Sequence, residues 1–380
     1  MIGVAGGYGD VGRHAVRALR RAGHPVRVGG RSAADRRPPQ PSHGPVVEHR
    51  TVDVRDAGSV AAFAEGLSVL VNCAGPSHLT GSVAADAALT AGVDYVDAAG
   101  DDALYALLDD GRYRRSARTA VLSAGLRPGL TGLFPRAVAR RARNAGMTRP
   151  ETVTVRTRVV DRFTTTSALE YLHGAADPGT GPMAAWRDGA PMPRAQHRRT
   201  VTDLPFFPGT STELPQLSAE DARTARALGV RDGDWLTLVR GTHVLAAFDR
   251  VHVLPPDEAA RRLCRAARLD LAGRPPAVTL AVVVTGHGDG GPVTRTGVLR
   301  GTGNAPLSGT VAAHTALRTL HGRIPPGRHF AADILDAEAA LAALTRTAGG
   351  DGTGPCARVE LLPEGADPFG PDATAEVGAL

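Results

Sequence analysis

Lysine is absent from the 380-residue chain, so all 44 basic residues are arginine. Without a lysine amine, neither Schiff-base chemistry nor lysine acid–base catalysis is available to the protein. Cysteine is also scarce: Cys73, Cys264 and Cys356 lie far apart and form no C-x-x-C pair. This spacing argues against a disulfide framework and against a structural zinc site, so we expect no bound metal.

Long apolar runs and aromatic residues are scarce too. No run reaches the roughly 18 apolar residues that a membrane span needs, and the N-terminus lacks the basic and apolar regions of a signal peptide. We therefore expect a cytoplasmic protein. Aromatic residues make up 4% of the chain and are not interleaved with the arginines behind the net charge of +6. This favours small anionic ligands over nucleic acid as partners.

A glycine-rich loop, GGYGDVG, lies between an apolar run at residues 2–5 and an amphipathic stretch at residues 13–22. Gly7, Gly9 and Gly12 fit the G-x-G-x-x-G pattern of dinucleotide sites. The first glycine allows a tight turn, the second lets the pyrophosphate approach the backbone, and the third allows close packing of helix and strand. An ordinary glycine-rich turn is the alternative. The predicted pyrophosphate-binding residues are Gly7, Tyr8, Gly9, Asp10, Val11 and Gly12.

The residues after the second predicted strand indicate which dinucleotide binds. The chain reads Gly30-Arg31-Ser32 with no carboxylate before Asp35, whereas NAD sites usually place Asp or Glu here to bind the ribose. This favours NADP(H), because Arg31 could pair with the 2′-phosphate and Ser32 could donate a further hydrogen bond. A solvated loop arginine is the alternative. A third strand at residues 46–54 would place Asp53 near the adenine.

Strands and helices alternate through the first third of the chain, which predicts a Rossmann fold, a doubly wound parallel sheet of about six strands. Ligands of such sheets bind beyond the carboxyl ends of the strands. Four later runs, at residues 152–160, 245–254, 277–285 and 293–299, read as strands. They predict an inserted α/β domain built on a mainly antiparallel sheet.

The pattern thus predicts four parts. They are an NADP-binding Rossmann domain (1–135), a second, α/β domain (150–303), C-terminal helices that return to the Rossmann domain (305–345), and a Gly-, Pro- and Asp-rich tail without fixed structure (348–380). Met1 lies one residue before the first strand, which leaves open a start further upstream.

Residues 71–101, VNCAGPSHLTGSVAADAALTAGVDYVDAAGD, resemble the saccharopine dehydrogenase-like reductases, which carry a similar Asn-Cys-Ala-Gly-Pro turn and a downstream Tyr-Val-Asp-x-x-Gly. The GGYGDVG loop, the SAGLRPG turn at residues 123–129 and the helix after Ser308-Gly309 support the resemblance. It covers residues 1–135 and 305–345. It implies a Rossmann domain interrupted by a substrate and dimerisation domain (150–303), hydride transfer with NAD(P)H to imines, and a homodimer.

The resemblance also implies site residues. A wall near the nicotinamide would consist of Asn72, Ala74, Gly75 and Pro76, and a second wall of Tyr95, Asp97 and Gly100. Cys73, within the first wall, is expected to be a small packed residue rather than a nucleophile.

Reduction of a C=N or C=O bond needs hydride and a proton donor within hydrogen-bond reach. The candidate donors are Tyr171, which we favour, with His78 and Asp97. His78 could instead cap a helix, Tyr171 could simply pack, and an iminium substrate already carries its proton. Arg127, Arg158 or Arg162 could bind a substrate carboxylate.

These features predict an NADPH-dependent reductase that transfers hydride to the C=N bond of a small, carboxylate-bearing substrate. Arginine in place of lysine, with abundant alanine and glycine, is typical of a high-GC bacterial gene, and such reductases often serve specialised metabolism. Two alternatives stay open. One is a ketone or enoyl reductase with the same cofactor, and the other is a non-catalytic NADP-binding sensor.

Overall fold

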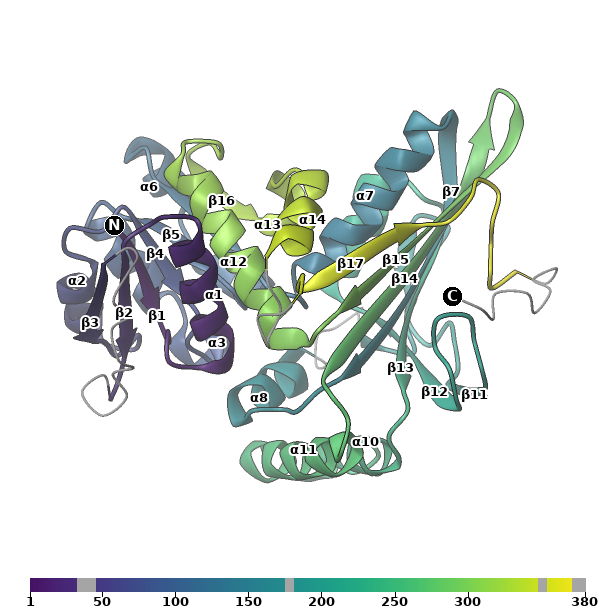
Figure 1. Ribbon diagram of the computed structural model, residues 1–380, viewed down its shortest axis with the longest axis horizontal. Helices are drawn as coiled ribbons and strands as arrows, with labels where there is room; N and C mark the ends of the chain where they lie inside the picture. Colours follow the sequence, from purple (N-terminus) through teal and green to yellow (C-terminus); the bar gives the residue numbers. More distant parts are fainter. Residues whose placement is uncertain (33–45, 175–180, 348–353, 371–380) are drawn as a thin grey trace. The chain divides into compact units, whose positions relative to one another are not determined.

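The computed structural model describes residues 1–32, 46–174, 181–347 and 354–370 (Figure 1). The chain divides into two compact units. Unit 1 comprises Met1–Leu133 and Asn304–Cys356, and unit 2 comprises Phe134–Gly303 and Ala357–Leu380. Asp35 lies outside the described residues. Among the helices that are described, none is long and apolar enough to cross a lipid bilayer.

Unit 1 contains a parallel sheet, of which the described residues contribute seven strands in the order β16-β6-β5-β4-β1-β2-β3. The strands are β1 (Ile2–Ala5), β2 (Val26–Gly30), β3 (Val47–Thr51), β4 (Val69–Asn72), β5 (Asp94–Asp97), β6 (Thr119–Leu122) and β16 (Gly327–Phe330). The chain moves outward in opposite directions from β1, through β2 on one side and β4 on the other. This is the switch point at which doubly wound sheets bind their ligands, and it confirms the predicted Rossmann fold.

Strand β16 is one strand more than the six that we expected. Its sequence, Gly-Arg-His-Phe, follows two prolines and carries polar residues in the middle, so it has no apolar run. Polar residues are tolerated there because β16 lies at the edge of the sheet and pairs within it with β6 alone.

Helices cover both faces of this sheet, as the apolar character of the strands requires. They are α1 (Asp10–Arg21), α2 (Ala57–Ala64), α3 (Ser77–Thr80), α4 (Val83–Thr90), α5 (Asp102–Leu107), α6 (Asp110–Arg115), α12 (Asn304–Leu320), α13 (Ala331–Ile334) and α14 (Ala337–Arg346). Helix α12 lies beside α1 (Figure 1) and approaches it closely, since a Cβ on Gly309 would lie 2.7 Å from the Ala15 nitrogen. The late helix α12 therefore packs on the first helix of the chain.

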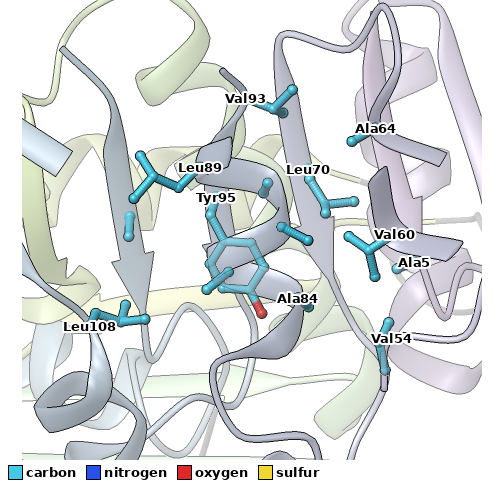
Figure 2. Packing of buried hydrophobic residues seen from close by; sticks show 14 of the residues in the cluster. Ala5, Val54, Val60, Ala64, Leu70, Ala84, Leu89, Val93, Tyr95 and Leu108 are labelled. Carbon is cyan, nitrogen blue, oxygen red and sulfur yellow. The ribbon is translucent and has the colours of Figure 1, made fainter. Parts of the chain in front are cut away.

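The core on one side of the sheet is built from small and branched residues around Tyr95 (Figure 2). Leu70, Val60 and Ala64 pack there from β4 and α2, and each is at most 1% exposed. Alanines of α4, such as Ala84, allow that helix to lie close to the strands.

In unit 2 the described residues form a ten-stranded, mainly antiparallel sheet with the main order β10-β9-β13-β7-β14-β15-β17. Its strands are β7 (Met147–Val160), β8 (Gly181–Pro182), β9 (Ala185–Arg187), β10 (Ala190–Met192), β11 (Arg199–Val201), β12 (Ser211–Leu217), β13 (Asp232–Val239), β14 (Ala277–Gly288), β15 (Gly291–Gly301) and β17 (Ala357–Leu361). The pairing of β7 with β13 is parallel, and that of β7 with β14 is antiparallel. This confirms the predicted mainly antiparallel sheet.

The helical segments of this part are α7 (Leu130–Asn144), which leads from unit 1 into unit 2, then α8 (Thr165–Gly174), α9 (Ala219–Leu228), α10 (Thr242–Phe248), the 3₁₀ helix η2 (Val251–Val253) and α11 (Pro256–Leu271). The prediction of a strand at residues 245–254 is wrong, because α10 and η2 occupy it. Val244, Ala247, Phe248 and Val251 recur at helical spacing and pack in one cluster, although their β-branched neighbours favoured a strand.

The predicted unstructured tail is wrong for part of its length. Residues 357–361 form β17, which pairs antiparallel with β15. The run Ala-Arg-Val-Glu-Leu alternates apolar and charged residues, as an edge strand does, but the surrounding Gly, Pro and Asp obscured it. Residues 348–353 and 371–380 of that tail lie outside the described residues.

Candidate cofactor-binding site

The glycine loop joins β1 to α1 at the switch point of the unit 1 sheet. Gly6, rather than Gly7, carries the left-handed backbone of the tight turn, with φ of 70°. A Cβ on Gly6 would also lie 2.7 Å from the Ala74 nitrogen, so the loop is in close contact with the turn after β4. Gly7 is required for packing, because its Cβ would lie 2.6 Å from Val28 Cγ1. Sequence analysis missed Gly6, although the consecutive glycines at this turn were the available signal.

Gly12 has the packing role that the pattern predicts, and contact of Gly9 with a pyrophosphate stays a prediction. A Cβ on Gly12 would lie 2.2 Å from the Gly6 carbonyl oxygen, so α1 can begin this close to the loop only with glycine there. A Cβ on Gly9 would meet nothing nearer than that same oxygen, at 3.2 Å. The backbone at Gly9 is therefore open to approach, and the N–H groups of the first turn of α1 point out of the helix end. This arrangement fits a dinucleotide pyrophosphate.

At the outer end of the loop, the Tyr8 hydroxyl and His49 Nδ1 share a hydrogen bond of 2.8 Å, and the two rings stack with centroids 6.0 Å apart. The Tyr8 ring lies over Gly30, whose Cβ would lie 2.8 Å from Tyr8 Cδ2. Arg31 and Ser32 follow directly and are exposed. Sequence analysis did not single out His49, because a histidine on a polar, half-exposed strand gives no distinct signal.

Asp53 lies at the same end of the site. Its carboxylate accepts two hydrogen bonds from the Arg55 guanidinium, at 3.0 and 2.7 Å. These bonds lower the pKa of Asp53 to about 2, and the positive charge of Arg31 contributes to the same shift. The charges of Arg31 and Asp53 therefore interact, and the place of Arg31 beside the cofactor stays a prediction. A direct contact of Asp53 with the cofactor stays a prediction.

On the other side of the switch point, Asn72 and Asp97 end the adjacent strands β4 and β5 and are 1% and 2% exposed. Asn72 Nδ2 donates to Asp97 Oδ2 at 2.9 Å, and Asn72 Oδ1 accepts from the Ala74 N–H at 3.0 Å. The amide of Asn72 thus links β5 to the first residues of the Asn-Cys-Ala-Gly-Pro turn.

The Asp97 carboxylate accepts hydrogen bonds from the turn after β5. Its Oδ1 accepts from the N–H groups of Ala99 and Gly100 at 2.9 and 2.8 Å, and its Oδ2 also accepts from the Tyr95 hydroxyl at 2.5 Å. Burial, with the charge of Asp97, raises the pKa of Tyr95 well above its usual range, so the phenol keeps the proton that it donates. With Asn72, four donors satisfy one buried carboxylate, an arrangement that fixes the position of both turns.

A third turn adjoins these two at the end of β6. Ser123 has a positive φ of 57° and donates through Oγ to the Gly100 carbonyl at 2.8 Å. The Leu126 N–H donates to Ser308 Oγ at 3.0 Å, so the N-terminal part of α12 also contacts this turn. The carboxyl ends of β1, β4, β5 and β6 are therefore connected into one rigid edge.

Cys73 lies half-buried in the first of these turns. Burial, with a smaller contribution from the charge of Asp97, raises the pKa of the Cys73 thiol far above its usual range. The thiol is therefore protonated at neutral pH, which agrees with a packed residue and not with an activated nucleophile.

The three predicted proton donors differ in their surroundings. Asp97 is buried in its network, and His78 is half-buried on α3, directly after the cis Gly75–Pro76 peptide of unit 1. Tyr171 lies on α8 of unit 2, where its ring stacks on Phe248 at 5.2 Å and meets Phe163 edge-on at 5.9 Å. Each role in proton transfer stays a prediction.

Comparisons with known proteins agree with this geometry. Residues 2–122 match the family model described as the saccharopine dehydrogenase NADP binding domain. No curated protein matches the chain. Among solved structures, apo saccharopine dehydrogenase (L-Glu forming) from Saccharomyces cerevisiae is similar, with 14% identity and a TM-score of 0.67, over 95% of this chain and 99% of that chain. At this identity the likeness shows the fold.

Two further solved structures align over most of the chain with lower TM-scores. The C. glutamicum DAP dehydrogenase in complex with DAP has 13% identity and a TM-score of 0.41, over 88% of this chain and 93% of that one. An engineered D-amino acid dehydrogenase bound to NADP⁺ has 13% identity and a TM-score of 0.42, over the same shares. The family match identifies residues 2–122 as an NADP-binding domain of the saccharopine dehydrogenase type, so the protein is an NADP-dependent oxidoreductase.

Proposed function

We propose that the protein is an NADPH-dependent reductase that transfers hydride to the C=N bond of a small, carboxylate-bearing substrate. The observation that carries the proposal is the linked pair of turns after β4 and β5, within a saccharopine dehydrogenase NADP-binding domain. The resemblance of these turns to those of imine-reducing enzymes supports C=N as the reactive bond. The whole-chain fold that it shares with a saccharopine dehydrogenase (L-Glu forming) is consistent with this.

Different residues of unit 1 would bind different parts of the cofactor. The open backbone at Gly9 and the N-terminus of α1 would hold the pyrophosphate, because helix N–H groups and the helix dipole favour anions. Arg31 and Ser32 would bind the 2′-phosphate, where a guanidinium forms charge-assisted hydrogen bonds. The small residues Ala74 and Gly75 would form the wall beside the nicotinamide.

When bound, NADPH supplies hydride from its nicotinamide C4. Asp97 acts in this scheme as a positioning residue, because four hydrogen-bond donors already engage its carboxylate. His78 and Tyr171 are the remaining candidates to protonate the substrate nitrogen. An iminium substrate would need neither, because its nitrogen already carries the proton.

The proposal extends to the setting of the reaction. A homodimer in the bacterial cytoplasm, serving specialised metabolism, is consistent with the family resemblance and with the arginine-rich, lysine-free composition. We propose this setting together with the activity.

Calorimetric titration with NADPH and, separately, NADH tests the cofactor site. We expect Arg31→Ala to weaken NADPH binding by about 10- to 100-fold, because a charge-assisted hydrogen bond contributes roughly 1.5–3 kcal/mol, and to leave NADH binding nearly unchanged. Arg115→Ala is the matched control, since Arg115 is exposed on α6. Equal loss for both cofactors in the Arg31 variant, or no binding of either by the wild type, would contradict the cofactor assignment.

Turnover then tests the chemistry. Pairs of an amine and a keto acid should oxidise NADPH, whereas either partner alone should not. Oxidation with the ketone or an enoyl compound alone would instead identify a C=O or C=C reductase. Tight NADPH binding without turnover on any of these would identify a sensor.

A further inference from the structure

A cavity of about 250 Å³ within unit 2 is lined by three arginines, Arg158, Arg240 and Arg274. Arg158 lies near the end of β7 and pairs in register with Thr279 of β14. Arg240 directly follows β13, the other neighbour of β7, and Arg274 lies in the turn before β14. Three adjacent strands thus bring their cationic side chains to one pocket.

These guanidiniums lack a carboxylate counter-ion in the part of the chain that the structure describes. Arg156, two residues earlier on β7, shows the contrast. Its Nε lies 3.0 Å from Glu213 Oε1, and Glu213 is buried. Arg156 and Arg158 lie on the same side of β7, and the described residues provide a carboxylate for Arg156 but none for Arg158.

Two of the three arginines, Arg158 and Arg240, also contact a neighbouring turn. Arg158 donates through Nη1 to the Pro208 carbonyl at 3.2 Å, and its guanidinium lies 5.2 Å from the centre of the Phe207 ring. Arg240 lies against the same turn, since a Cβ on Gly209 would be 3.1 Å from Arg240 Nη2. Burial, with the charge of Arg240, lowers the pKa of Arg158. The positive charges of Arg158 and Arg240 therefore lie close enough to repel each other, and a bound anion would offset this repulsion.

We propose that this pocket binds a small dianion, as a phosphate group or a dicarboxylate. Guanidiniums donate pairs of parallel hydrogen bonds to such oxyanions. Three guanidiniums balance the charge of a ligand of −2 better than that of a monocarboxylate, which carries only −1. The apolar sides of Val160 and Ala277 limit the pocket to a small group. The site belongs to unit 2, is distinct from the cofactor loop, and does not depend on the proposed reductase activity.

The test uses the full chain saturated with NADP⁺, so that added phosphate does not compete at the cofactor site. Inorganic phosphate and glutarate are titrated separately by calorimetry. We expect both to bind the wild type, and Arg158→Gln and Arg274→Gln each to weaken binding at least about tenfold. Arg149→Gln is the matched control, because Arg149 is an exposed arginine at the opposite end of β7, paired with Glu151, and should bind like the wild type.

A thermal melt separates loss of binding from loss of fold. Phosphate should raise the Tm of the wild type and of Arg149→Gln, but not that of Arg274→Gln, which changes a turn residue and should leave the fold intact. Absence of binding by the wild type, or equal weakening in the Arg149 and Arg274 variants, would overturn the proposal. These measurements need no turnover, so failure of the reductase proposal would not affect them.

A competition experiment distinguishes the two sources of such a dianion. Competitive inhibition of turnover by glutarate, lost in Arg274→Gln, would show that the pocket receives the anionic group of the substrate. Binding of glutarate without inhibition would show that it receives a separate ligand. Either result supports an anion site.

Discussion

Asn72 donates to Asp97 through a 2.9 Å hydrogen bond between the last residues of two adjacent parallel strands. The two residues are 25 positions apart in the sequence. Their contact joins the turn after β4 to the turn after β5, the two segments proposed to stand beside the nicotinamide. Because both side chains are buried, the geometry of these turns depends on a satisfied polar network rather than on apolar packing alone.

Asp97→Asn should destabilise the protein by about 2–4 kcal/mol and weaken NADPH binding. An asparagine at this position would place an amide donor against the Asn72 amide or the Tyr95 hydroxyl, both of which donate to Asp97. Urea unfolding and calorimetry provide the two measurements. Tyr95→Phe is the graded comparison, since it removes one donor of the four and should cost about 1 kcal/mol. Equal stability of the Asn variant and the wild type would contradict the network's role.

Gly9→Ala and Gly12→Ala should separate binding from folding. The Gly9 variant should keep nearly the wild-type free energy of unfolding but bind NADPH at least about tenfold more weakly, because the methyl group would occupy the open side of the loop. The Gly12 variant should lose about 1–3 kcal/mol or more, because its methyl group would collide with the Gly6 carbonyl. Thermal melts and NADPH titrations of both variants check this, and a Gly9 variant with normal affinity would count against the loop as the pyrophosphate site.

Mild acid should destabilise unit 1 through two half-buried histidines. Burial, followed by Arg318 and Arg346, lowers the pKa of His314 to about 4, and burial, followed by Arg17 and Arg13, lowers that of His14 to about 4. The unfolded chain therefore binds more protons between pH 6.5 and 4, so stability is complete above pH 6.5 and falls as the pH drops through this window. After discounting for partial exposure, each histidine should account for on the order of 1–2 kcal/mol.

His314→Gln tests this linkage. Urea unfolding of the variant and of the wild type at pH 7.5 and at pH 5 gives the pH-dependent change in stability for each. The variant should lose less stability on acidification than the wild type. An equal loss in the two proteins would show that His314 is not one of the groups responsible.

Cys73 should react slowly with iodoacetamide at neutral pH in the native protein, because burial raises the pKa of its thiol. Mass spectrometry of the labelled peptides measures the rate of Cys73 labelling. Labelling in denaturant is the control that shows the reagent to be active. Cys73→Ala should retain NADPH affinity within about a factor of three, because a packed methyl group replaces a packed thiol. Rapid native labelling of Cys73 would instead point to an activated nucleophile.

Local patterns were sufficient where one sequence period dominates. The apolar runs of β1, β4 and β14 predicted their strands, because burial on both faces of a sheet requires such runs. Local patterns were insufficient at α10 and η2, where the valines of η2 favoured a strand although the apolar spacing was helical. They also failed at the edge strands β16 and β17, where short polar sequences are stabilised by pairing with a neighbour that is distant in the sequence.

By itself, the sequence determined the Rossmann architecture, the dinucleotide loop and the preference for NADP(H), because each depends on residues that are neighbours along the chain. The tertiary structure alone decided that Gly6 makes the tight turn, that Asp97 is held by four donors, and that His49 meets Tyr8. It also decided which arginines at the unit 2 pocket lack a carboxylate partner among the described residues. These features depend on strand pairing and side-chain burial, and residues far apart in the sequence supply both.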